Sequence, residues 1–261
     1  MSVVALTRRR FLLLAAAGGG LVLVGDRYTY LHDLVEPPAW AIAQPRPPIR
    51  RITDSPSPSV DLSSPSAPLV VQDTVSIRGG DSAFLIQPEA PNRTLQRCQA
   101  LEVAAGDRVT YGKHAVYAKA QGITVLDFYA TGSEFAASGF SVRYAGFHGE
   151  RFELDGFDIC LTYFEEEPLA GPVLFKDGRG VFTNTGAWLS LGAGSRVTPD
   201  FVFDNVWLEG PGKFVGCQPG LLDGTVTIQN GCMWRANAGD PWQPVTAAMC
   251  QDIPAAKLTI T

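Results

Sequence analysis

Residues 152–157 of the chain read FELDGF, and four related stretches accompany them: FAASGF at 135, FTNTGA at 182, FVFDNV at 201 and VTIQNG at 226. Each begins with an apolar residue and continues, three positions later, with a polar residue followed by Gly or Asn. Gly and Asn are the residues that enter the left-handed backbone region most easily. The recurrence therefore predicts a bend that is repeated along the chain between short strands.

Apolar residues beyond each bend suggest that the repeats stack. Seven positions after each start the residue is always apolar: Val142, Ile159, Leu189, Leu208 and Met233. Alternate residues of a strand point to the same face, so such positions would form inward columns from coil to coil. We expect an all-β fold, a parallel β-solenoid. An antiparallel β-sandwich is the alternative, because the starts at 135 and 152 are only 17 residues apart.

Composition divides the chain into three regions. Residues 1–43 form a signal region, and residues 44–68 a Pro/Ser-rich linker that buries too little apolar surface to fold. Residues 69–261 alternate β-branched or aromatic runs with Gly, Asp and Asn, which predicts the solenoid domain with a C-terminal cap. The one helix favoured by periodicity is 92–105, with Leu95, Cys98 and Leu101 spaced by three.

The N-terminal residues Thr7-Arg8-Arg9-Arg10-Phe11-Leu12 precede an apolar run that ends at Val24. This pattern resembles a bacterial twin-arginine signal peptide, which implies export of the folded protein by the twin-arginine translocase and a periplasmic or secreted location. The run is shorter than the roughly 20 residues of a membrane-spanning helix, so cleavage is favoured over anchoring.

Charge and cysteine content limit the class of partner. Residues 44–261 hold 17 Lys and Arg against 23 Asp and Glu, since four Arg and three acids precede them. An acidic chain without basic clusters argues against a nucleic-acid partner. Five cysteines predict one or two disulfides, with Cys217–Cys232 or Cys232–Cys250 nearest in sequence, or else buried free thiols. Because the number of cysteines is odd, at least one thiol is free or pairs with another chain. The second case would make the protein an oligomer.

The repeated bends with Asn and Gly resemble those of the right-handed parallel β-helix proteins, the pectate-lyase-like and polygalacturonase-like group. The resemblance implies a polysaccharide or cell-envelope glycan as partner. The catalytic pattern of polygalacturonases does not carry over, because Asn184-Thr185 is followed by Gly186 and no Asp-Asp pair exists. His148 also lies upstream of Asn184 rather than downstream, where that family has its Gly-His-Gly.

Binding residues are predicted from the outward positions of the aligned repeats. Trp188 and Trp207 take equivalent positions and would lie side by side on neighbouring strands, flanked by Ser141 and Glu209. Indole rings stack on sugar faces, and charges bind hydroxyls or uronates. The alternative is that a loop or the tail with Trp242 covers these rings.

Catalysis would rest on other residues. Asp158 and Glu166, the latter in the Glu165–Glu167 loop, are candidate acids, and Arg143 is a candidate cation for a uronate. Carboxylates also bind Ca²⁺, although no spacing here requires a metal or another cofactor. We therefore expect an exported, non-catalytic polysaccharide-binding or envelope-associated protein, with a polysaccharide lyase or glycoside hydrolase as the alternative.

Overall fold

The computed structural model describes residues 12–14, 21–23, 60–77, 82–103, 114–132, 138–163, 171–183, 187–191 and 196–261. The chain divides into two units, Met1–Gln44 and Pro45–Thr261. In the first unit, β1 (Leu12–Leu14) pairs antiparallel with β2 (Leu21–Leu23). The Arg pair of the signal and the linker up to residue 59 lie outside the described residues. No described helix is long and apolar enough to cross a membrane.

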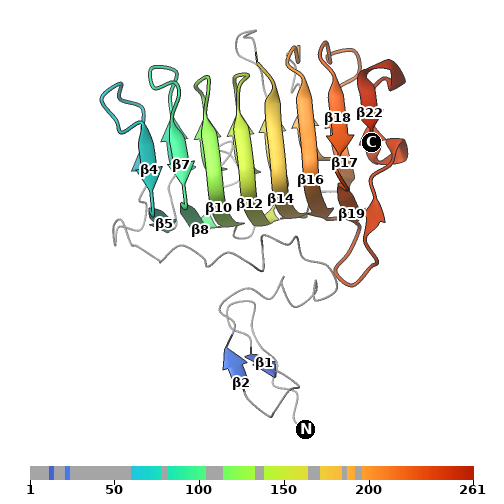
Figure 1. Ribbon diagram of the computed structural model, residues 1–261, viewed down its shortest axis with the longest axis horizontal. Coiled ribbons are helices and arrows are strands. Elements are labelled where there is room, and N and C mark those ends of the chain that lie inside the picture. The colour runs from blue at the N-terminus through green and yellow to red at the C-terminus, as the bar shows by residue number, and fades with distance from the viewer. Residues whose placement is uncertain are drawn as a thin grey trace. The chain divides into compact units, whose positions relative to one another are not determined.

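The second unit is a parallel β-solenoid of two sheets (Figure 1). Every strand pair within it is parallel except β19 with β20. The twelve-stranded sheet contains β4 (Val70–Gln72), β5 (Val75–Ile77), β7 (Thr94–Gln96), β8 (Gln99–Val103), β10 (Thr124–Gly132), β12 (His148–Phe157), β14 (Val173–Phe182), β16 (Phe201–Glu209), β18 (Val226–Gln229), β19 (Met233–Arg235), β20 (Gln243–Pro244) and β22 (Leu258–Ile260). The eight-stranded sheet contains β3 (Val60–Asp61), β6 (Ser82–Ile86), β9 (His114–Ala118), β11 (Ser138–Val142), β13 (Ile159–Tyr163), β15 (Ala187–Leu191), β17 (Lys213–Cys217) and β21 (Cys250–Gln251).

The twelve-stranded sheet is bent along a line where the backbone turns left-handed. Seven non-glycine residues in successive coils have φ between 50° and 55° there. They are Asp73, Arg97, Asp127, Arg151, Asp177, Asn205 and Asn230, and we call them the corner ladder. β10, β12, β14 and β16 run through the bend, whereas β4 and β5, β7 and β8, and β18 and β19 are separated by it.

The corner ladder tests the repeat alignment. Phe201 pairs with Val226 and Asp204 with Gln229, so FVFDNV and VTIQNG are equivalent corners. The alignment of the other three repeats with these two corners is wrong. Phe152 pairs with Gly178, and Ser138-Gly139 lies inside β11 rather than at a bend. A coil takes 24 residues where Thr124 pairs with His148, so the spacing of 17 was not a coil length.

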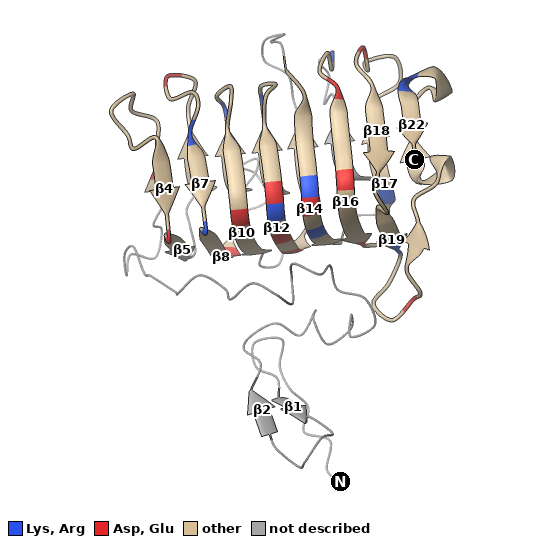
Figure 2. Cartoon of the chain, in the orientation of Figure 1, with Lys and Arg blue, Asp and Glu red and all other residues tan. Residues whose placement is uncertain are grey.

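Charges alternate in sign along the corner ladder. Arg97 Nε lies 2.7 Å from Asp73 Oδ1, and Arg151 Nε lies 2.6 Å from Asp127 Oδ1. Further along, Asn205 Nδ2 donates to Asp177 Oδ1 over 2.7 Å. The bend of β12 and β14 shows adjacent acidic and basic segments in Figure 2. Neighbouring strands lie only about 4.8 Å apart, so alternation replaces repulsion between stacked like charges by attraction.

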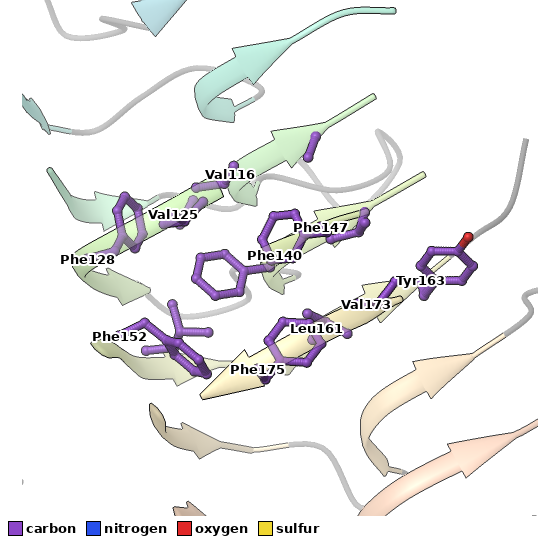
Figure 3. Packing of buried hydrophobic residues seen from close by; sticks show 14 of the residues in the cluster. Val116, Val125, Phe128, Phe140, Phe147, Phe152, Leu161, Tyr163, Val173 and Phe175 are labelled. Carbon is purple, nitrogen blue, oxygen red and sulfur yellow. The ribbon is translucent and has the colours of Figure 1, made fainter. Parts of the chain in front are cut away.

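The core between the sheets is aromatic (Figure 3). Phe140 of β11 has its ring centroid 5.3 Å from Phe152, 5.5 Å from Phe147 and 5.7 Å from Phe128. All four are buried. Such edge-to-face and tilted pairs add to the burial term, which is about 1.5–3 kcal/mol for each side chain of this size.

Two local expectations are wrong. The helix expected over 92–105 is not formed by the described residues 92–103. They supply β7 and β8, and a left-handed Arg97 between them replaces the helical spacing. The predicted disulfides Cys217–Cys232 and Cys232–Cys250 are absent, since all three thiols are free, as is that of Cys98. Cys217 and Cys232 instead belong to the buried core.

Candidate functional site

Two cations and a tyrosine gather on the outward face of the eight-stranded sheet. Val116 and Ala118 of β9 point into the core, so Tyr117 and Lys119, the residue after β9, point outward. Val142 of β11 likewise points inward, and Arg143 follows it. The hydrogen bond from the Arg143 amide to the Ala118 carbonyl, 2.9 Å, aligns the two strand ends.

The tyrosine ring holds the cations together. Lys119 Nζ lies 4.7 Å and Arg143 Cζ 5.2 Å from the centroid of the Tyr117 ring. Arg143 Nη2 also donates a hydrogen bond of 3.0 Å to the Tyr117 hydroxyl. The negative face of an aromatic ring attracts cations, and this attraction offsets part of the repulsion between the two like charges. We call Tyr117, Lys119 and Arg143 the Tyr117 patch.

Hydroxyl groups continue this face along the sheet. Ser141 pairs with Tyr117 on one side and with Thr162 on the other. Thr162 Oγ1 donates to Ser141 Oγ over 3.2 Å. Ser141, a predicted binding residue, is buried, whereas Thr162 is half-buried. Thr162 is therefore the more accessible of the two hydroxyls.

A buried histidine lies against the patch. The His114 ring centroid is 4.9 Å from that of Tyr117, and His114 Nδ1 shares a hydrogen bond of 2.5 Å with Ser138 Oγ. Burial, and secondarily the charge of Arg143, lowers the pKa of His114 to about 3. The imidazole is consequently neutral at pH 7, and the charge beside Tyr117 comes from Lys119 and Arg143.

Trp207, predicted as a binding ring, packs instead against the tail. Its ring centroid lies 5.0 Å from that of Trp242 in an edge-to-face pair, and its Nε1 donates to Asn205 Oδ1 over 3.0 Å. Arg235 Cζ lies 4.4 Å from the Trp242 ring. Glu209, the second predicted binding residue here, is buried and accepts a hydrogen bond of 3.0 Å from Arg235 Nε. Trp242 of the tail therefore contacts Trp207, which remains half-buried.

The expectation that Trp188 and Trp207 are neighbours in one sheet is wrong. Trp188 belongs to β15 of the eight-stranded sheet, and Trp207 belongs to β16 of the twelve-stranded sheet. The error follows from the repeat alignment, which matched Phe182 with Phe201, whereas Phe201 pairs with Val173. The side chain of Trp188 lies outside the described residues.

The two candidate catalytic residues that the structure describes, Asp158 and Arg143, lie apart. Asp158 is exposed and accepts a hydrogen bond of 3.3 Å from Thr183 Oγ1. Ser138 pairs with Ile159, which places Asp158 before the first residue of β11, while Arg143 follows the last. Six residues of strand separate these levels by about 20 Å, too far for an acid and a cation to act on one sugar. Glu166 lies outside the described residues.

No group of three or more His, Cys, Asp or Glu within the described residues could hold a metal ion. Tyr117 and Lys119 were missed because the alignment started at residue 135, after β9. The x-Tyr-x-Lys alternation at 116–119, matched with Ser141-Val142-Arg143 one coil later, is the signal that could have found them.

Comparison with protein-family models, curated proteins and solved structures finds no match to this chain.

Proposed function

We propose that this chain is an exported, non-catalytic β-solenoid protein that binds an anionic polysaccharide through the Tyr117 patch. The observation that carries the proposal is the convergence of Lys119 and Arg143 on one tyrosine ring at an outward sheet face. Two neighbouring cations suit a carboxylate or sulfate group, because charge-assisted hydrogen bonds are stronger than neutral ones. Export rests on the resemblance of residues 7–12 to a twin-arginine signal.

The ring acts as a support for the cations more than as a stacking platform. Lys119 and Arg143 both lie within about 6 Å of its centroid, the range of cation–π attraction, so a sugar would meet the cations first. The hydroxyl of Thr162, two strands from Tyr117, offers a further hydrogen-bonding group along the sheet. A linear polymer lying across the strands would contact both.

The position of Asp158 supports a non-catalytic role. A lyase needs a base beside the cation that neutralises the uronate, and His114, the histidine of β9, is buried with its pKa lowered to about 3. Asp158 stands at the other end of the strand. The patch therefore supports binding without bond cleavage.

The test measures the binding of the purified chain to a uronate-containing polysaccharide and to a neutral one by isothermal titration calorimetry. Lys119→Gln with Arg143→Gln should weaken binding to the uronate polymer by about 1–2 kcal/mol, or about fivefold to thirtyfold, and raised salt should do the same. Arg196→Gln is the matched control, because Arg196 forms an exposed pair with Asp223 elsewhere. Equal affinity for the neutral polymer, or release of new sugar ends, would refute the proposal.

A further inference from the structure

Within the described residues, both ends of the solenoid end in strand edges without a further strand partner, and each end has exposed apolar side chains. At one end the sheets terminate in β4 and β3, and at the other end β22 and β21 are the last strands of their ladders. The exposed large hydrophobic residues among the described ones are Leu69 (64%), Val70 (47%) and Ile260 (39%). Leu69 and Val70 belong to the β4 edge, and Ile260 belongs to β22, several strands away in Figure 1.

The two edges belong to the same inward columns of the core. Val71 and Ile260 are the first and last members of one column in the twelve-stranded sheet, in which each residue pairs with the next. Val60 and Cys250 are the first and last members of an equivalent column in the eight-stranded sheet. A copy of β4 placed on β22 would continue the first column, and β3 placed on β21 would continue the second.

We propose that copies of this chain associate head to tail, with β4 and β3 of one copy pairing in parallel with β22 and β21 of the next. The contact continues the interface that already joins each coil to its neighbour. Val71 would stack on Ile260 and Val60 on Cys250, while the backbone groups of both edges gain partners. A second copy fits this surface better than an unrelated segment, because its columns arrive in register on both sheets.

The edge strands β4 and β22 lack the basic side chains and prolines that often prevent such pairing. β4 reads Val-Val-Gln and β22 reads Leu-Thr-Ile, without Lys, Arg or Pro. Asp61 of β3 would stand opposite Gln251 of β21, where an amide can donate to the carboxylate. Beyond the bend, β20 already covers β19 in antiparallel pairing and ends in Pro244. The association therefore uses the edges of β22 and β21 and not that of β19.

This contact joins two different surfaces, so it does not close into a dimer and it extends into chains. The eight-stranded sheet spans seven strand spacings and the contact between copies adds an eighth, so each copy would add about 38 Å and one Tyr117 patch. A chain of copies would therefore present the patch repeatedly to one long polymer, which raises avidity without new contacts.

The first experiment measures mass by light scattering on the chain of residues 1–261 over a range of concentrations. The wild-type mass should grow past that of a dimer, whereas Leu69→Lys and Ile260→Lys should each be monomeric. An equimolar mixture of these two variants should form dimers, because each retains one intact edge. A monomeric wild type, a dimer that grows no further or a monomeric mixture would overturn the proposal.

The second experiment decides the case if a lysine variant fails to fold. Val60→Cys places a thiol at the level of Cys250 of the neighbouring copy, and strands about 4.8 Å apart allow a disulfide. The two positions lie about 34 Å apart within one chain, so the bond can form only between copies. Oxidation should give a ladder of linked chains that Cys250→Ser abolishes. Absence of the ladder, or linkage that persists without Cys250, would contradict head-to-tail pairing.

Discussion

Acid should destabilise the solenoid through His114. The folded state lowers the pKa of His114 from 6.5 to about 3, because burial first and Arg143 second disfavour the imidazolium. A group whose folded pKa is depressed contributes stability that is complete above its unfolded pKa and is lost as pH falls toward the folded value. The sensitive window is therefore pH 6.5 to about 3.

The magnitude follows from the two pKa values. Between pH 8 and pH 5 the unfolded chain takes up nearly one proton at this position and the folded chain almost none, which costs about 2 kcal/mol of unfolding free energy. Carboxylates remain mostly ionised down to pH 5, so this window separates histidine protonation from carboxylate protonation. His114→Gln, which keeps a hydrogen-bonding group beside Ser138, should lose about 2 kcal/mol less than the parent over the same interval.

Urea unfolding followed by tryptophan fluorescence at pH 8 and pH 5 measures the difference. Arg143→Gln should reduce the pH dependence only in part, because burial is the larger cause. His148→Gln, which removes a histidine from the other sheet, is the control for loss of a histidine. An equal loss of stability in the parent and in His114→Gln would show that the imidazole is not desolvated and would refute the reasoning.

Three further predictions concern the fold. Gly178→Ala should lower the free energy of unfolding by about 1–3 kcal/mol, because its new Cβ would lie 2.0 Å from Cζ of Phe152. In urea melts, the double variant with Phe152→Leu should lose less than the sum of the two single changes. Phe140→Ala should cost about 3–5 kcal/mol and lower the midpoint of thermal unfolding, unless the surrounding rings collapse into the cavity. Arg151→Met should lower the free energy of unfolding by about 1–2 kcal/mol at low salt, because it removes the ion pair with Asp127. The same loss measured in an Asp127→Asn background, in a double-mutant cycle, would contradict the pairing.

The fold class followed from local chemistry. Asn205 and Asn230, each preceded by a polar residue and followed by an apolar stretch, mark true corners because the left-handed backbone there favours Asn. The same rule did not find Asp127 and Arg151, which adopt the same conformation although neither is Gly or Asn. Their positions are stabilised by ion pairs to the neighbouring coils, and such pairs are not visible in a single repeat.

The binding side chains show the same limit. Arg143 was a candidate from its charge and outward position, yet Tyr117 and Lys119, which complete its site, come from the preceding coil, 24–26 residues earlier. The alignment matched Phe201 with Phe182 although its partner, Val173, lies nine residues earlier, and this placed Trp188 and Trp207 in one sheet although they belong to two.

Sequence alone determined the β-solenoid class, the period-two burial and the position of two corners, because these depend on the backbone preferences and polarity of residues close together in the chain. Only the tertiary structure decided the register between coils, since side chains about 25 residues apart become neighbours through it. That register placed Lys119 and Arg143 on one tyrosine ring, separated Asp158 from Arg143 and set Val71 and Ile260 at the two ends of one column.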